Sequence, residues 1–119
     1  MKTVIIGGSA GLGRALANEL AADGHDLFIV SSDERDLTPV VSDLKLRHKI
    51  QCYCKSVDLN NIDVNELRHT VLNYFNTIDN LFIVAGFSPS TAAGPINDDL
   101  AKKILEVNMS SEIRIVNSF

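Results

Sequence analysis

The sequence predicts an α/β domain built on a parallel β-sheet with helices on both faces. Two observations support this prediction. Short apolar segments rich in β-branched residues alternate along the chain with segments of helical periodicity, as in repeated βαβ units. A glycine-rich turn, residues 7–13, joins the first apolar segment to the first helical one. A turn at that place suits a ligand site at the carboxyl end of the first strand.

Length and composition fit one globular domain. The chain has 119 residues, of which 45% are hydrophobic and 22% are charged. Its net charge is −4 and it has no basic run, so we do not expect binding to nucleic acid. No apolar stretch approaches the roughly 20 residues that cross a bilayer, and no secretion signal is evident. We therefore expect a cytoplasmic protein without a membrane partner.

The first three predicted elements are a strand, a helix and a strand. Residues 2–6 form a β-branched run that ends at two glycines, which indicates a strand. Residues 11–23 have the spacing of a helix with one apolar face. Residues 27–31 indicate the second strand. The side chains expected to face inward from the helix are Leu12, Ala15, Leu16 and Leu20.

The next three elements repeat this alternation. Thr38 followed by Pro39 predicts the N-cap and the first position of a helix that continues to about His48. Residues 50–57 alternate and are rich in strand formers, so they predict a third strand. Residues 63–77 predict a helix with apolar side chains at helical spacing.

The last third of the chain contains a strand, a loop and helical sequence. Residues 81–85 are apolar throughout, as in a strand covered on both faces, and residues 87–94 predict a loop. Residues 97–107 predict a helix. The tail, residues 108–119, fits a helix or a strand, and we favour the helix. Right-handed crossovers then give the strand order 3-2-1-4, a Rossmann-type sheet without the later strands of the full fold.

The glycine-rich turn is the strongest candidate for a binding site. Glycines permit positive φ angles and let a ligand approach the backbone, and the start of a helix offers free N–H groups to a phosphate. The alternative is a turn with a packing role only. Leu16 stands where the Gly-x-Gly-x-x-Gly fingerprint needs its third glycine, and no phosphate-loop Lys follows. The candidate phosphate-binding residues are Gly7, Ser9, Gly11, Leu12 and Gly13.

These features resemble the short-chain dehydrogenase/reductase family. Ile6 to Gly13 resembles the family's Thr-Gly-x-x-x-Gly-x-Gly motif, with Ile6 in place of Thr. Val107-Asn108 resembles the segment with the Asn of the family's catalytic tetrad, so the resemblance implies a catalytic role for Asn108. Asn108 also fits a polar residue that ends a helix.

Two further segments carry the resemblance. Asp58-Leu59 resembles the family's Asp and its neighbour at the adenine ring, although Asp58 also fits a cap on the next helical turn. Ala85-Gly86 resembles the end of the family's Asn-Asn-Ala-Gly motif, which implies close approach of the nicotinamide ribose. The alternative is that these two small residues only form a tight turn at the end of the strand. Residues 83–84 are Ile and Val in place of the two asparagines.

The end of the second strand bears on the choice between NAD and NADP. A carboxylate there accepts from the ribose 2′-OH and repels a 2′-phosphate, whereas Arg does the opposite. Asp33 and Glu34 are acidic, so we favour NAD over NADP as the cofactor. Ser32 occupies the position where Asp would be most informative, and Arg35 is the nearest basic residue.

The family's Tyr-x-x-x-Lys pair is absent from this sequence. Tyr53 is followed four residues later by Val57, and Tyr74 by Ile78. We expect the chain to be the cofactor-binding half of a longer oxidoreductase acting on a carbonyl or alcohol, and to be inactive alone. The small-molecule substrate is not specified by these residues.

A non-catalytic dinucleotide-binding or dimerisation module is the alternative function. The two C-terminal helices resemble those of the family's dimer interface, so we expect a homo-oligomer. Ile104, Met109, Ile113 and Val116 are candidates to face a partner, although burial against the sheet explains some of them equally well. No metal site is expected, because the histidines and the two cysteines lack ligand spacing.

Overall fold

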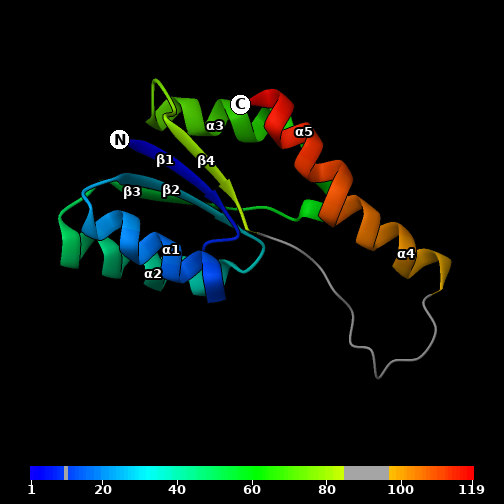
Figure 1. Cartoon of the computed structure of the whole chain (residues 1–119), viewed down its shortest axis with the longest axis horizontal. Helices are drawn as coiled ribbons and strands as arrows, with labels where there is room; N and C mark the ends of the chain where they lie inside the picture. The colour runs from blue at the N-terminus through cyan, green and yellow to red at the C-terminus, as the bar shows by residue number, and fades with distance from the viewer. Residues whose placement is uncertain (10, 85–96) are drawn as a thin grey trace.

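The computed structural model, which describes residues 1–9, 11–84 and 97–119, is built on a four-stranded parallel sheet (Figure 1). The strand order is β3-β2-β1-β4, as the sequence predicts. Val4 lies opposite Phe28 of β2 and Leu81 of β4, so β1 is paired on both sides. The strands are β1 (Lys2–Ile6), β2 (Asp26–Ser31), β3 (Cys52–Ser56) and β4 (Asn80–Ile83).

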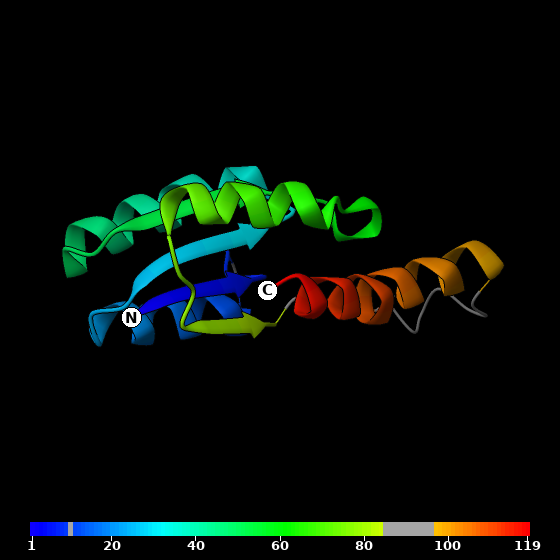
Figure 2. The same ribbon diagram turned by 90° about the horizontal axis from the view of Figure 1, so that it is seen from above.

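Helices cover both faces of the sheet. Two of them, α1 (Gly11–Ala22) and α2 (Glu34–His48), lie on one face, and α3 (Val64–Tyr74) and α5 (Ser111–Ser118) lie on the other (Figures 1 and 2). This arrangement confirms the predicted α/β architecture. A 3₁₀ turn, η1 (Leu59–Asn61), joins β3 to α3.

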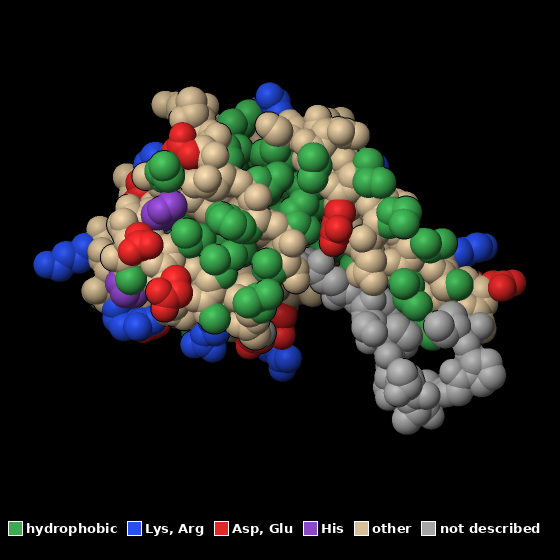
Figure 3. Space-filling model, viewed as in Figure 1, with side chains coloured by type: hydrophobic (Ala, Val, Ile, Leu, Met, Phe, Trp, Pro, Cys, Tyr) green, Lys and Arg blue, Asp and Glu red, His purple; other side chains and the backbone are tan. Residues whose placement is uncertain are grey.

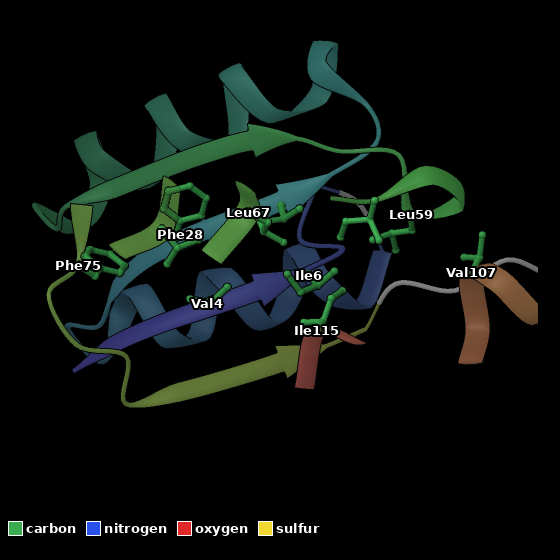
Figure 4. Close-up of a cluster of buried hydrophobic side chains, with 11 residues drawn as sticks. Val4, Ile6, Phe28, Leu59, Leu67, Phe75, Val107 and Ile115 are labelled. Atoms are coloured by element: carbon green, nitrogen blue, oxygen red, sulfur yellow. The ribbon is translucent and has the colours of Figure 1, made fainter. Parts of the chain in front are cut away.

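Successive side chains of the strands point to opposite faces, so the sheet separates two apolar cores. Ile5 and Ile29 face α1 and α2, whereas Val4 and Phe28 face α3 and α5. The core under α3 and α5 (Figure 4) is completed by residues from the helices and turns, chiefly Leu59, Leu67, Val71, Phe75, Val107 and Ile115.

The buried face of α1 differs from the predicted one. Its buried residues are Gly13, Ala17 and Ala21, whereas Leu12 is 74% exposed and Leu16 is half-buried. Small side chains at four-residue intervals let the helix axis approach the sheet closely, which the larger leucines would prevent. The prediction that Leu12 and Ala15 face inward is therefore wrong, because both are exposed.

The start of α2 also differs from the prediction. The helix begins at Glu34, with Asp33 as its N-cap: Arg35 N donates to Asp33 Oδ1 over 3.0 Å. Pro39 lies inside the helix, so the predicted cap at Thr38 is wrong. The earlier start adds a turn that buries Leu37, which is 1% exposed.

The C-terminal segment is helical, as favoured from the sequence. After α4 (Asp98–Leu105), a π-helical turn, η3 (Glu106–Ser110), leads directly into α5. We call this continuous helical segment, α4 to α5, the α4–α5 rod. Its α4 end extends past the carboxyl ends of the strands (Figure 2). Ser111 anchors the junction, because its side chain is buried and donates to Val107 O over 2.7 Å. The π turn was not predicted.

Candidate functional site

A cavity of about 370 Å³ lies at the carboxyl ends of the four strands. This volume is in the range of small-molecule sites, and the position is the one at which parallel sheets bind ligands. The wall is formed by residues at the ends of all four strands and by residues of the segment α4–η3. The described residues that line it are Ile6, Gly7, Val30, Ser31, Ser32, Val57, Asp58, Leu59, Val84, Lys103 and Val107.

The glycine-rich turn shapes one end of this cavity. Gly7 lines the wall and has φ of 97°, a conformation that L side chains rarely adopt. A Cβ atom on Gly13 would lie 1.9 Å from Gly7 O, so the absence of a side chain lets α1 pack against the turn. Gly11 has φ of 56° with open space around it. The positive φ angles of Gly7 and Gly11 agree with the backbone freedom expected of this turn, and the contact at Gly13 fits the alternative of a packing role.

The other predicted turn residues lie outside the cavity wall. Ser9 is 6% exposed and its Oγ is 2.6 Å from Ser31 Oγ, so the protein itself already engages the hydroxyl predicted to reach a phosphate. The exposed Leu12 stands at the start of α1. Contact of Ser9, Gly11, Leu12 and Gly13 with a ligand stays a prediction.

The end of β2 contributes hydroxyl groups to the wall. Ser31 and Ser32 both line the cavity. Asp33 does not, because its carboxylate caps α2 and lies 3.6 Å from Arg35 Nε. Ser32 lines the cavity and Asp33 does not, and contact of either residue with a cofactor stays a prediction.

The turn after β3 supplies the third side of the site. Asp58 and Leu59 both line the cavity. Asn60 N donates to Asp58 Oδ1 over 2.9 Å, so Asp58 is the cap of η1 as well as a wall residue. Both interpretations made from the sequence are therefore compatible at this position, and adenine contact stays a prediction.

The last predicted site residues belong to the β4 end and to the helical rod. Val84 lines the cavity, but Ala85 and Gly86 lie outside the described residues. Asn108 is exposed on the π turn, next to the wall residue Val107. Single π-helical turns occur frequently at functional sites, and a catalytic role for Asn108 stays a prediction.

Sequence reasoning missed Lys103. Its side chain reaches the cavity from α4, and with Asp58 it is one of the two charged residues among the described residues of the wall. No local pattern marks Lys103, because its proximity to the strand ends depends on how the α4–α5 rod packs on the sheet. Its positive charge and the negative charge of Asp58 are opposite in sign, so the described part of the wall carries no net charge.

The two cysteines of β3 are structural. Cys52 and Cys54 are free thiols on the same strand, and burial raises the pKa of both, that of Cys52 to about 12. No group of three or more potential metal ligands occurs within residues 1–9, 11–84 and 97–119. In the same segments, no helix is long and apolar enough to cross a membrane.

We expect Cys52 to resist thiol reagents in the folded chain. At about pH 8, a pKa near 12 leaves a thiolate fraction roughly 1,000-fold smaller than that of an ordinary thiol. The measurement is the rate of disulfide exchange with an aromatic disulfide reagent in a Cys54→Ser variant, with and without guanidinium chloride. Equal rates in the folded and unfolded chain would contradict the burial of Cys52.

Comparison with known proteins assigns the family. The family model for short chain dehydrogenases matches residues 2–119. The chain belongs to this family. The match covers the glycine-rich turn, all four strands and the α4–α5 rod, so the cavity occupies the carboxyl end of a short chain dehydrogenase sheet.

Several relatives and solved structures are similar to the chain. An uncharacterized oxidoreductase of Staphylococcus epidermidis is 24% identical over 115 residues, which are 97% of this chain and 49% of that protein. An alcohol dehydrogenase of Thermococcus sibiricus, solved with 5-hydroxy-NADP, has a TM-score of 0.87 at 23% identity and matches 99% of this chain.

An actinorhodin polyketide ketoreductase solved with NADPH also has a TM-score of 0.87, at 19% identity over 98% of this chain. The chain covers 51% of the alcohol dehydrogenase and 45% of the ketoreductase. It thus spans about half the length of the relatives that it matches.

Proposed function

We propose that this chain is the dinucleotide-binding part of an NAD(P)-dependent oxidoreductase that acts on a carbonyl or alcohol. The observation that supports the proposal is the cavity at the carboxyl ends of the four strands, which has Gly7 of the glycine-rich turn in its wall. Bound there, the nicotinamide group would supply hydride transfer, and the residues of this chain would bind and orient it.

The residues of the cavity fit a dinucleotide. The wall combines apolar surface from Ile6, Val30 and Leu59 with hydroxyls at the end of β2. Lys103 supplies a cation that suits a diphosphate, and Asp58 offers a carboxylate that suits the donor edge of an adenine. Two structural neighbours were solved with NADPH or an NADP derivative, which supports a nicotinamide cofactor.

The proposal covers both NAD and NADP. The sequence favours NAD because Asp33 and Glu34 follow β2. However, neither residue lines the cavity, and the Asp33 carboxylate already accepts a hydrogen bond from its own helix.

The two free cysteines support the expected cytoplasmic location, since thiols persist there in the reduced state.

The test is to titrate the chain with NADH and NADPH and to follow the nicotinamide fluorescence. We expect saturable binding, and no turnover of aldehydes or ketones, because neither tyrosine is followed four residues later by Lys. Absence of binding by both cofactors would refute the dinucleotide site. Reduction of any carbonyl substrate would refute the claim that the chain is inactive alone.

A second candidate function is assembly with another copy of the chain. Four apolar side chains of the rod are each more than half exposed, and Figure 3 shows hydrophobic side chains along this part of the surface. They are Leu105, Met109, Ile113 and Val116. An apolar row of this kind supports a homo-oligomer formed through the C-terminal helices.

Light scattering tests this second function. We expect a mass above that of the monomer for the chain, and a monomer for a Met109→Lys, Ile113→Lys double variant. Because both side chains point away from the core, the variant should keep its helical content. A monomeric parent chain would refute self-assembly and would leave the binding function untouched.

A further inference from the structure

The two outer strands of the sheet differ in how their free edges are protected. These strands are β3 and β4. β3 carries Lys55, whose Nζ donates to Glu66 Oε1 of α3 over 2.8 Å. A lysine on an edge strand hinders pairing with another chain. β4, with the sequence Asn-Leu-Phe-Ile, has neither a charged residue nor a proline, so it is the unprotected edge of the described sheet.

The backbone of β4 is paired on one side. It pairs with β1, and among the described residues no strand lies on its other side (Figure 2). Val84 N donates to Ile6 O over 2.9 Å. Because the backbone groups of successive residues point to opposite sides of a strand, those of Leu81 and Ile83 point to the free edge. They are available to a strand added there.

The surface beside this edge is apolar. All four residues of β4 are partly exposed, and an open hollow of about 380 Å³ lies between Ile83 and α5. Ile113 and Val116 line the hollow from α5 and are 54% and 57% exposed. Figure 3 shows hydrophobic side chains gathered over β4 and α5. A contiguous apolar patch next to unpaired backbone groups indicates an interaction surface.

A second copy of β4 is complementary to this edge. In an antiparallel pair about a two-fold axis perpendicular to the sheet, Phe82 can face Phe82 of the second copy. Leu81 then lies opposite Ile83 of the second copy, and the outward backbone groups of these two residues meet. The cross-strand pairs are apolar and no charge lies opposite a like charge, which favours pairing.

The two-fold arrangement also closes the assembly. Both α5 helices lie on the same face of the joined sheet, so the apolar hollows of the two copies are brought to the same interface. The joined sheet ends in β3 on both sides, and each β3 carries Lys55. Pairing thus uses both unprotected edges and stops at two copies. An unrelated strand would have to bring a protected edge of its own.

We propose that the free edge of β4 is a self-association surface, at which two copies of the chain join their sheets through antiparallel β4 strands. This surface differs from the apolar row of the α4–α5 rod, because Leu105 and Met109 do not line the hollow, although Ile113 and Val116 belong to both surfaces. The inference does not depend on dinucleotide binding.

The first measurement follows amide hydrogen exchange by NMR, and mass by sedimentation, in the 119-residue chain over a wide range of concentration. We expect a dimer at high concentration, in which exchange of the Leu81 and Ile83 amides is slower by about tenfold or more than in the dilute chain. A dimer whose β4 amides exchange as fast as in the dilute chain overturns the inference and leaves assembly through the rod standing. A monomer at every concentration overturns it, whether those amides exchange slowly or fast.

The second measurement uses lysine variants of the two edge strands. Phe82→Lys places like charges opposite each other in the pair, so we expect a monomer with rapidly exchanging β4 amides. The matched control is Ser56→Lys, which adds the same charge at an exposed position of β3 and is expected to dimerise as the parent chain does. Circular dichroism checks the fold of both variants.

A dimer in folded Phe82→Lys, or a monomer in folded Ser56→Lys, would overturn the assignment of the β4 edge. If Phe82→Lys does not fold, the concentration dependence of amide exchange in the parent chain decides the question, because it requires no substitution.

Discussion

Replacement of Gly13 by alanine is expected to abolish dinucleotide binding and to lower the free energy of unfolding by about 3 kcal/mol. The added Cβ would lie 1.9 Å from Gly7 O, 2.7 Å from Gly7 C and 2.8 Å from Val84 Cγ2. Two of these atoms are backbone, so no change of rotamer relieves the overlap. The start of α1 must move away from the turn that forms one end of the cavity.

Gly24→Ala is the control for this variant. Gly24 has φ of 85°, and its added Cβ would have no atom within 4 Å. We expect it to cost about 1–2 kcal/mol from backbone conformation alone and to leave cofactor affinity unchanged. Denaturant unfolding and NADH titration measure the two effects. Equal destabilisation by the two variants would mean that the contact between α1 and the turn is not as close as the structure has it.

The sheet was predictable because its signals are local. Each strand is a run of strand-forming residues between turns, and β1 begins and ends where the sequence indicates. The buried face of α1 was not predictable from side-chain size alone, since the close approach of helix and sheet selects Ala17 and Ala21 over the leucines. The π turn lies where Val107 and Ser111 are buried against the rest of the chain, and burial of this kind is a tertiary effect that a local sequence pattern does not specify.

The position at which α2 begins changes which residues are expected to meet a ligand in the cavity. A helix that begins at Pro39 leaves Asp33 in a loop, where its carboxylate could face a ribose. The observed helix begins at Glu34 and uses that carboxylate as its cap. Burial of Leu37 favours the longer helix, and this contribution outweighs the preference of proline for the first turn. The wall of the cavity therefore receives Ser32 in place of an acidic side chain.

Phe75→Ala is expected to lower the free energy of unfolding by about 3–5 kcal/mol. Phe75 is fully buried, and its ring lies edge-on to Phe28 at 6.4 Å and to Tyr53 at 5.9 Å between centroids. The Lys2 ammonium lies 5.1 Å from the centre of the same ring. Removal of the ring leaves a void that these side chains cannot fill, so the cost exceeds that of the lost apolar surface.

Tyr74→Ala is the control that distinguishes the effect of losing a buried ring from the effect of losing an exposed one. Tyr74 precedes Phe75 in the chain and stacks on Tyr53 at 4.3 Å, but it is 52% exposed. We expect a loss of about 1 kcal/mol, since its partner stays in place and water can fill the site. Denaturant midpoints measure both variants, and equal losses would contradict the burial of Phe75.

Phe75→Ala and Gly13→Ala together test whether stability and cofactor binding are separable. Phe75 lies against Lys2, at the amino ends of the strands, whereas the cavity lies at their carboxyl ends. The folded fraction of Phe75→Ala should therefore bind NADH with the affinity of the parent chain, while Gly13→Ala loses binding even under conditions in which it is folded. Loss of affinity in folded Phe75→Ala would show that the aromatic core holds the strand ends in register for the cofactor.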